Sequence, residues 1–288
     1  MKPAPFQYFA PTTISETLDL LAQYGADAKL LAGGQSLVPT MNFRLATPTM
    51  LIDLNRVNEL AYIQSRGHAL AIGAMTRQRA VERDAAVGKI APLVAETMPF
   101  IAHPQIRNRG TFGGSLAHAD PASELPAVAI ALSAKLKAKN KKGERWIDAR
   151  DFFVSLFTTA LEPDEMLIEI ELPALPPRTG WSFMEVARRH GDYALAGVTA
   201  IVSLNANGAC ENARIVLMSV GATPMDAQNA AKILVGEKPD TKAIQAAANA
   251  VDAEIDPSGD IHASAEFRRH LARVLTRRAL TMALQRAK

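Results

Sequence analysis

The stretch QIRNRGTFGGSLAHADP, residues 105–121, is richer in small and hydroxyl-bearing residues than a tight turn requires. Its central residues are Thr111, Phe112, Gly113, Gly114 and Ser115, and Arg107 and Arg109 stand just upstream. Glycine tolerates positive φ and lets another group approach the backbone closely, and turns of this kind form anion-binding concavities. The stretch therefore predicts a loop around a phosphate-bearing ligand. The alternative is a tight turn that is glycine-rich for structural reasons alone.

A second glycine pair strengthens the ligand interpretation. This pair comes earlier in the chain, so we call its surroundings the first glycine loop and the loop at 111–115 the second. The residues of the first loop are Ala32, Gly33, Gly34, Gln35 and Ser36. They follow an apolar run at 29–31 and precede a helix-like segment at 37–41, with Ser36 in the N-cap position. Free N–H groups after a glycine turn attract phosphate, and two such loops suit a diphosphate better than a monophosphate. Neither loop is a dinucleotide fingerprint or a P-loop.

Two segments contain these loops and carry a family resemblance. They are LLAGGQSLVPTMNFRLATPTMLIDLNRV, residues 30–57, and IAHPQIRNRGTFGGSLAHADPASELPAV, residues 101–128. Both resemble the FAD-binding medium subunit of molybdenum hydroxylases of the carbon monoxide dehydrogenase and xanthine dehydrogenase type. Chain length, the order of the motifs and a later Gly191-Asp192-Tyr193 extend the resemblance over the whole sequence.

The resemblance implies a set of cofactor contacts. Both glycine loops would hold the FAD pyrophosphate through backbone N–H groups. Ile101 would lie by the flavin ring and Tyr193 against one face of it, where an aromatic side chain packs and screens water. Asp120 and Glu124 would lie near the ribityl–phosphate region, and Leu167 would reach the adenine side.

Composition and cysteine count set the limits of this role. The chain has 288 residues, 48% of them hydrophobic, a net charge of +3 and a single cysteine, Cys210. One cysteine cannot hold a four-cysteine iron–sulfur cluster. The resemblance therefore implies that [2Fe–2S] clusters and molybdopterin lie on partner subunits, one small and one large, as a dimer of heterotrimers. Without an 18-residue apolar run or an apolar targeting segment, we expect a cytoplasmic protein with no transmembrane segment.

The sequence pattern predicts an α+β fold in two domains. Residues 1–177 form the FAD-binding domain, in which 1–57 is a small βαβ-like unit and 58–177 combines a mixed or antiparallel sheet with helices. Residues 178–288 form a three-stranded antiparallel sheet with a helical bundle. The run 166–172 alternates at period two, which predicts a strand with one solvent-facing side. A final helix at 265–287 has a predicted core stripe of Phe267, Leu271, Val274, Leu275 and Met282.

The chemistry points to a cofactor rather than to catalytic side chains. No nucleophile–base motif and no metal-binding motif occurs, so we assign no catalytic residue and no metal ligand. The leading interpretation is a flavin subunit that accepts electrons and delivers them to an external acceptor. One alternative is a stand-alone flavin reductase, which requires a proton donor that no evident Ser or Glu group supplies. The other is a scaffold without flavin, which two intact loops argue against. No aromatic platform for nucleic acid accompanies the arginine-rich final helix.

Overall fold

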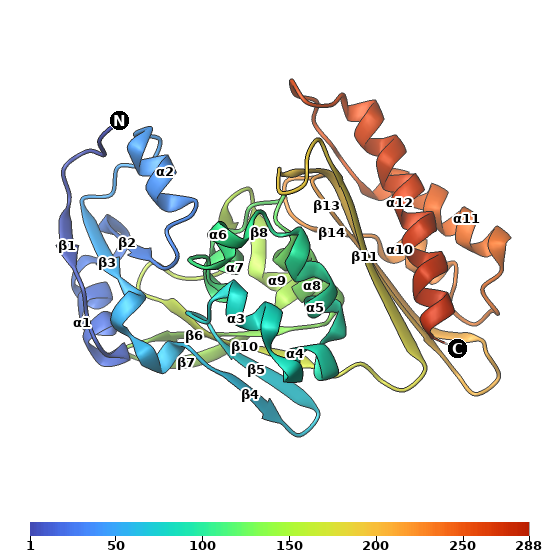
Figure 1. Ribbon diagram of the computed structural model, residues 1–288, viewed down its shortest axis with the longest axis horizontal. Coiled ribbons are helices and arrows are strands. Elements are labelled where there is room, and N and C mark those ends of the chain that lie inside the picture. The colour runs from blue at the N-terminus through green and yellow to red at the C-terminus, as the bar shows by residue number, and fades with distance from the viewer. Residues whose placement is uncertain (288) are drawn as a thin grey trace.

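The computed structural model describes residues 1–287 and has the predicted α+β architecture, with three sheets side by side along the molecule (Figure 1). The N-terminal unit contains a parallel three-stranded sheet in the order β1-β3-β2. Its elements are β1 (Gln7–Phe9), α1 (Ile14–Tyr24), β2 (Ala28–Leu31), α2 (Leu37–Asn42) and β3 (Met50–Asp53). The βαβ-like unit is thus confirmed, and the short β1 is an addition that the sequence did not reveal.

The middle of the molecule is a five-stranded antiparallel sheet in the order β4-β5-β10-β6-β7. Its strands are β4 (Ile63–Arg66), β5 (Ala69–Gly73), β6 (Lys135–Asn140), β7 (Gly143–Asp148) and β10 (Met166–Pro173). Helices lie over this sheet (Figure 1), namely α3 (Gln78–Arg83), α4 (Ala85–Ile90), α5 (Pro92–Thr97), α6 (Pro104–Arg107), α7 (Phe112–His118) and α8 (Glu124–Ala131). A short helix and hairpin follow β7: α9 (Ala149–Phe152), β8 (Phe153–Ser155) and β9 (Thr158–Thr159). Single 3-10 turns are η1 (Gly25–Asp27), η2 (Leu54–Arg56), η3 (Asn58–Leu60), η4 (Met98–Phe100) and η5 (Val251–Glu254).

Strand β10 is present as predicted, but the prediction that one of its faces is exposed to solvent is wrong at Glu169. It lies in the centre of the sheet, and Glu169, on the expected wet face, is only 3% exposed. The carboxylate accepts two hydrogen bonds from Arg66, at 2.9 and 2.7 Å, and another from the Tyr62 hydroxyl. These partners lower the pKa of Glu169 against the opposing effect of burial. The alternation therefore reflects a charged residue buried with its partners, which a period-two pattern does not distinguish from a solvated face.

The C-terminal sheet has four strands rather than three, in the antiparallel order β11-β12-β13-β14. Its strands are β11 (Thr179–Ala187), β12 (Ala194–Leu204), β13 (Cys210–Met218) and the two-residue β14 (Met225–Asp226). The helices that follow are α10 (Gln228–Lys232), α11 (Thr241–Ala250) and α12 (Ala265–Arg286). Helix α12 packs along one face of this sheet, and α8 from the middle of the molecule packs against β12 and β13. The inner sheet face thus continues the core of the preceding region.

The long helix α12 corrects the predicted core stripe. Leu271 and Leu275 are buried, but Phe267 is 46% exposed and Met282 is 36% exposed. Arg268 is buried instead, and it donates to the main-chain oxygen of Leu195 at 2.7 Å and pairs with Asp260. A helix with small residues on its buried face allows a long arginine to cross the interface, which a hydrophobicity pattern alone does not predict.

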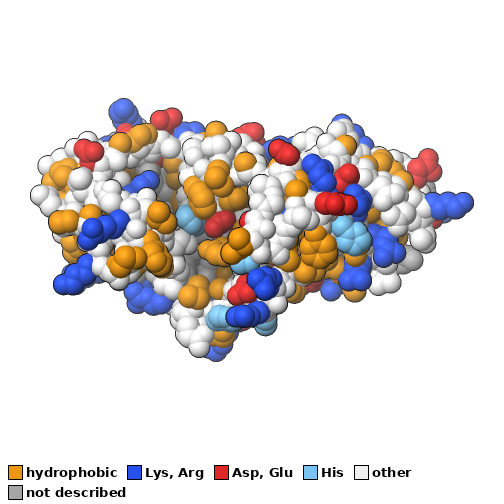
Figure 2. Space-filling model, turned by 90° about the horizontal axis from the view of Figure 1, so that it is seen from above, with side chains coloured by type: hydrophobic (Ala, Val, Ile, Leu, Met, Phe, Trp, Pro, Cys, Tyr) orange, Lys and Arg blue, Asp and Glu red, His pale blue; other side chains and the backbone are white. Residues whose placement is uncertain are grey.

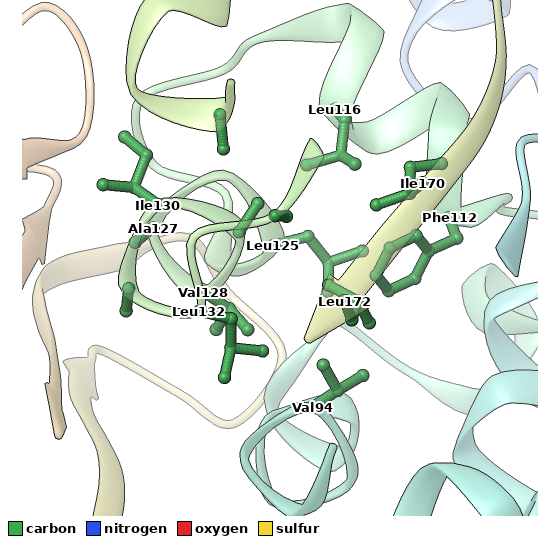
Figure 3. Packing of buried hydrophobic residues seen from close by; sticks show 14 of the residues in the cluster. Val94, Phe112, Leu116, Leu125, Ala127, Val128, Ile130, Leu132, Ile170 and Leu172 are labelled. Atoms are coloured by element: carbon green, nitrogen blue, oxygen red, sulfur yellow. The ribbon is translucent and has the colours of Figure 1, made fainter. Parts of the chain in front are cut away.

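The largest core lies between the sheet of β10 and the helices above it (Figure 3). Phe112, Leu116 and Leu125 point from α7 and α8 toward Ile170 and Leu172 of β10. All five side chains are at most 1% exposed, so this packing holds α7 rigidly against the strand. The second glycine loop leads directly into α7 and is therefore fixed to the core. Within residues 1–287, no helix is both long and apolar enough to cross a membrane.

Candidate functional site

The first glycine loop, Ala32–Ser36, connects β2 to α2 and offers unused donors. Gly34 has φ +73°, which an L-residue adopts only with strain. Among residues 1–287, the N–H groups of Gly33, Gly34, Gln35 and Ser36 have no hydrogen-bond acceptor. The Gln35 amide donates to the Gly33 oxygen at 2.9 Å and so stiffens the loop from within. These four neighbouring N–H groups lie in a half-buried loop and are free, as the sequence predicts for a glycine turn that receives a phosphate, and their binding of an anion stays a prediction.

Ser36 stands at the predicted cap position but does not cap. Its backbone is already helical, and its side chain accepts no hydrogen bond from the first turn of α2. Because α2 has only six residues, its dipole is small, and we assign the anion-binding property to the loop N–H groups themselves.

In the second glycine loop the N–H groups of residues 112–115 donate to acceptors within the chain. Phe112 N–H donates to Thr76 O and Gly113 N–H to Ala74 O, both at 2.9 Å. Gly114 N–H donates to the Thr111 hydroxyl at 3.1 Å, and Ser115 N–H donates to Thr111 O. The interpretation of this loop as a nest of free N–H groups is therefore wrong in this structure. Thr111 is instead a true N-cap of α7.

The two loops touch each other directly. A Cβ added to Gly33 would lie 2.5 Å from Arg109 O and 2.7 Å from the Cα of Gly110. A Cβ added to Gly114 would lie 3.2 Å from the Cβ of Ala32. Glycine at 33 is thus required for the approach of one loop to the other. A larger residue there would push the two loops apart.

The two arginines upstream of the second loop have different surroundings. Arg107 is buried, pairs with Glu82 at 3.0 Å and donates to Ile101 O at 2.8 Å, so it supports the fold. Arg109 is exposed, and no ion pair of its side chain occurs among the described residues. Of the two, only Arg109 has a positive charge available for an anion.

Tyr193, Asp120, Glu124 and the first loop are close enough to influence one another. Tyr193 is 65% exposed, just before β12. Burial of its hydroxyl end raises its pKa, the charges of Asp120 and Glu124 raise it further, and a hydrogen bond with Ser36 lowers it. The tertiary fold thus brings together residues from three separate segments that the resemblance had assigned to one cofactor. An aromatic ring as exposed as this one leaves a face free for stacking.

Burial raises the pKa of two acids, one of which is close to Tyr193. Glu124, at the start of α8, is 8% exposed, and burial raises its pKa to about 7, with Asp120 adding to the shift. Burial and the charge of Glu124 raise the pKa of Glu185 on β11 to about 8. One carboxyl oxygen of Glu185 is buried without a hydrogen-bond partner. Glu185 also lines a cavity of about 230 Å³ together with Phe100 and His190.

Three predicted contact residues lie in the core. Phe112 is 1% exposed, Leu167 is 5% exposed and Ile101 is 7% exposed. Each packs in the same central cluster of apolar side chains. Their roles beside the flavin or the adenine stay predictions, and only the edge or the backbone of each residue is available for them. Seen from above, the surface is hollowed between the N-terminal unit, at the left, and the middle of the molecule (Figure 2).

These features fit a flavin dinucleotide. Free N–H groups of the first loop and the charge of Arg109 suit a diphosphate. The Tyr193 ring suits a planar aromatic group, and the acids near it suit hydroxyl or N–H groups. Within residues 1–287, no group of three or more His, Cys, Asp or Glu side chains is placed to hold a metal ion. Fold and site together define a flavin-binding protein of the α+β class.

Comparison with known proteins gives the family. Residues 4–175 match the FAD binding domain in molybdopterin dehydrogenase, and residues 181–283 match the CO dehydrogenase flavoprotein C-terminal domain. A 6-hydroxypseudooxynicotine dehydrogenase complex subunit alpha from Paenarthrobacter nicotinovorans is 43% identical over 100% of this chain and 97% of the relative. The carbon monoxide dehydrogenase medium chain of Hydrogenophaga pseudoflava is 39% identical over 99% of both chains.

Solved structures agree. A chain of carbon monoxide dehydrogenase from Hydrogenophaga pseudoflava has a TM-score of 0.97 at 40% identity and covers 99% of both chains. A chain of quinoline 2-oxidoreductase from Pseudomonas putida 86 has a TM-score of 0.94 at 38% identity, over 100% of this chain and 99% of the other. The chain belongs to the FAD-binding medium subunits of molybdenum hydroxylases, and the predicted resemblance is confirmed. It is an oxidoreductase subunit whose cofactor is FAD.

Proposed function

We propose that the chain is the FAD-carrying electron-transfer subunit of a heteromeric molybdenum hydroxylase. It takes electrons from [2Fe–2S] clusters of a small partner subunit and passes them to an external acceptor. A large partner subunit holds the molybdopterin cofactor and selects the substrate. The observation that carries this proposal is the first loop, whose four free N–H groups lie next to Tyr193.

The single cysteine supports the division of labour. Cys210 is 1% exposed, and burial raises the pKa of its thiol to about 11, so it stays protonated at neutral pH. An iron–sulfur cluster needs several thiolates on accessible sulfur atoms. The clusters therefore belong to another subunit in this proposal. We further propose that the whole enzyme is a dimer of heterotrimers in the cytoplasm. Within this chain, we propose a domain boundary between residues 177 and 178.

The side chains and loops of this subunit bind and orient the cofactor. Bound FAD supplies the redox chemistry, and the protein supplies its position and electrostatic surroundings. The first loop donates N–H groups to the diphosphate, and the Tyr193 ring covers one side of the flavin and excludes water from it. Glu124, close to Tyr193, and Glu185, close to Glu124, have raised pKa values and so hold protons more readily than exposed carboxyls do.

The test is co-expression with the genes that neighbour this one. The purified complex should release FAD on acid or heat treatment, at about one per copy of this chain, and its substrate should bleach the flavin absorbance. The chain expressed without partners should oxidise no heterocycle and no carbon monoxide. A native complex without flavin, or with FMN in its place, would contradict the proposal.

One observation favours a second candidate. The stand-alone flavin reductase had lacked a proton donor, and Glu124 with Glu185 now forms a pair of acids that retain protons near neutral pH. If the isolated chain, free of metals, reduces a substrate at the expense of a nicotinamide cofactor, the reductase is correct. The flavin-free scaffold remains the weaker alternative because the donors of the first loop are intact.

A further inference from the structure

Arg77 lies outside both glycine loops, between β5 and α3, yet its side chain reaches toward both of them. One guanidinium nitrogen, Nη2, donates to the side-chain oxygen of Asn55 at 2.5 Å. The other, Nη1, donates to the main-chain oxygen of Arg109. Asn55 belongs to the N-terminal unit and Arg109 to the segment of the second loop. The planar guanidinium therefore joins two parts of the fold, of which one lies 22 residues before Arg77 and the other 32 residues after it.

Asn55 transmits this contact to the first loop. Its side-chain nitrogen donates to the main-chain oxygen of Ala32 at 3.0 Å. Its backbone N–H donates to Asp53 at 2.9 Å, which fixes the side chain at the end of β3. Arg77, Asn55 and Ala32 thus form a continuous chain of hydrogen bonds behind the loop whose N–H groups are free.

The other arm of Arg77 ends where the two loops meet. The oxygen of Arg109 that accepts from Arg77 is the same atom that would lie 2.5 Å from a Cβ on Gly33. Backbone pairing holds this segment too, because Arg77 and Thr111 form an antiparallel bridge and Gln78 N–H donates to Gly110 O at 2.9 Å. The guanidinium therefore fixes the contact that sets the distance between the loops.

The charge of Arg77 is not neutralised by a carboxylate. Among residues 1–287, neither Arg77 nor Arg109 forms an ion pair. Burial lowers the pKa of Arg77, the positive charge of Arg109 lowers it further, and Asp53 opposes the shift from a distance. Two guanidinium groups near each other, beside free N–H donors, leave an excess of positive charge that a doubly charged anion would relieve.

We propose that Arg77 is a positioning residue for the diphosphate of the cofactor, because it clamps the two glycine loops at their contact and adds positive charge behind them. This inference rests on the proposed function in that it takes FAD as the ligand. Arg77 itself need not touch the diphosphate. It acts through Asn55 on the loop that donates the N–H groups, and through its charge on the anion.

The test compares three ligands on the full chain, co-expressed with its partner subunits and stripped of flavin. FAD and ADP carry the diphosphate, and riboflavin carries none. Arg77→Gln should weaken FAD and ADP about tenfold or more, as expected for loss of a charge-assisted hydrogen bond, with riboflavin binding unchanged. Arg79→Gln is the matched control, since Arg79 lies two residues further on, in the first turn of α3, and its guanidinium pairs with Glu82. It should leave all three affinities within about twofold.

Salt separates the charge from packing. Wild-type affinity for ADP should fall more steeply with ionic strength than that of Arg77→Gln, because only the wild type has the half-buried positive charge of Arg77, which salt screens. Arg77→Lys should recover part of the affinity at low salt, since it restores the charge without the two-armed geometry. Equal salt dependence in wild type and Arg77→Gln would overturn the electrostatic part of the proposal.

A mutant cycle tests the clamp. Asn55→Ala removes the arm to the first loop without changing charge, and it should weaken ADP by a smaller factor. Combined with Arg77→Gln it should add little, because the two residues act through one chain of contacts. Fully additive effects, or an Arg77→Gln variant with wild-type affinity for ADP, would refute the clamp. If the wild type binds ADP but not FAD, the proposed function is wrong. The role of Arg77 is then still tested by the difference in ADP affinity between the wild type and Arg77→Gln.

Discussion

The two glycine loops look alike in sequence and do opposite things with their backbone N–H groups. In the first loop Gly33, Gly34, Gln35 and Ser36 keep theirs free. In the second, residues 112–115 donate all four to Thr76, Ala74 and Thr111. A glycine pair indicates that something approaches the backbone closely. In both loops protein atoms fill that space, at Gly33 as at Gly113, so the difference lies in the N–H groups, which lack acceptors among the described residues in the first loop and are used within the chain in the second.

The strongest test of this difference is Gly113→Ala. A Cβ there would lie 2.6 Å from both the Cα and the Cβ of Ala74, in a buried strand end that has no room to move. We expect the free energy of unfolding of the flavin-free protein to fall by about 3 kcal/mol, as in other overpacked cores. Urea unfolding measures it.

Gly88→Ala is the control, because Gly88 lies in α4 and an added Cβ would meet nothing within 4 Å. It should be neutral, or stabilising by up to about 1 kcal/mol. A Gly113→Ala protein as stable as wild type would show that the second loop is not filled by protein contacts as described.

The segment after the second loop can be probed by pH without changing its backbone. Burial raises the pKa of Glu124 from 4.5 to about 7 in the folded chain. Its protonated form is thus favoured by folding, so its contribution is present at low pH and is lost as the pH rises through about 7. Between about pH 5 and pH 7 Glu124 alone should lower the free energy of unfolding by about 2 kcal/mol, and the raised pKa of Glu185 should add to the fall. Urea unfolding of the flavin-free protein across this range measures it.

Glu124→Gln should flatten that slope, and it also removes part of the cause of the raised pKa of Glu185. The acids Glu82, Glu165 and Glu169 have lowered pKa values, so their stabilising ion pairs are lost only at pH values below about 4.5. They lie outside the tested window. An unchanged slope in Glu124→Gln would show that Glu124 is not buried in its neutral form.

The smallest effects come from one hydroxyl in each loop. Thr111 is 2% exposed and caps α7 through Gly114 N–H, so Thr111→Ala should cost about 1–2 kcal/mol of unfolding free energy. Ser36 accepts no cap hydrogen bond, so Ser36→Ala should change it by less than about 0.5 kcal/mol. Thermal unfolding of the two variants side by side gives the comparison, and equal losses would contradict the assigned roles.

Local patterns predicted the elements whose hydrogen bonds are local. The hairpin of β6 and β7 turns at Lys141 and Lys142, next to Asn140, and the Asn140 side chain holds the turn by accepting from Lys142 and Gly143. Helix α12 was also placed almost to the residue. Pro99, shortly after α5, has no backbone N–H to donate to a continuing helix. Helix α5 therefore ends at Thr97, and a single 3-10 turn follows.

The site was predictable only in part, for a related reason. Glycines, hydroxyls and an aromatic residue in two short motifs identified the loops and Tyr193. Asn55 and Arg77 carry no such local signal, because their partners lie 22 to 32 residues away in the sequence. The Glu124–Glu185 pair was missed for the same reason, since the charges meet only when α8 packs near β11.

The sequence by itself determined the α+β class, the two loops, the lack of cluster-binding cysteines and the family of flavin subunits. These properties depend on residue identity and short spacing, so no tertiary contact is needed to read them. The tertiary structure alone decided which N–H groups stay free, which acids keep their protons and which arginine joins the loops. These depend on burial and on partners distant in sequence, because desolvation and hydrogen bonding are set by whatever the fold places alongside each group.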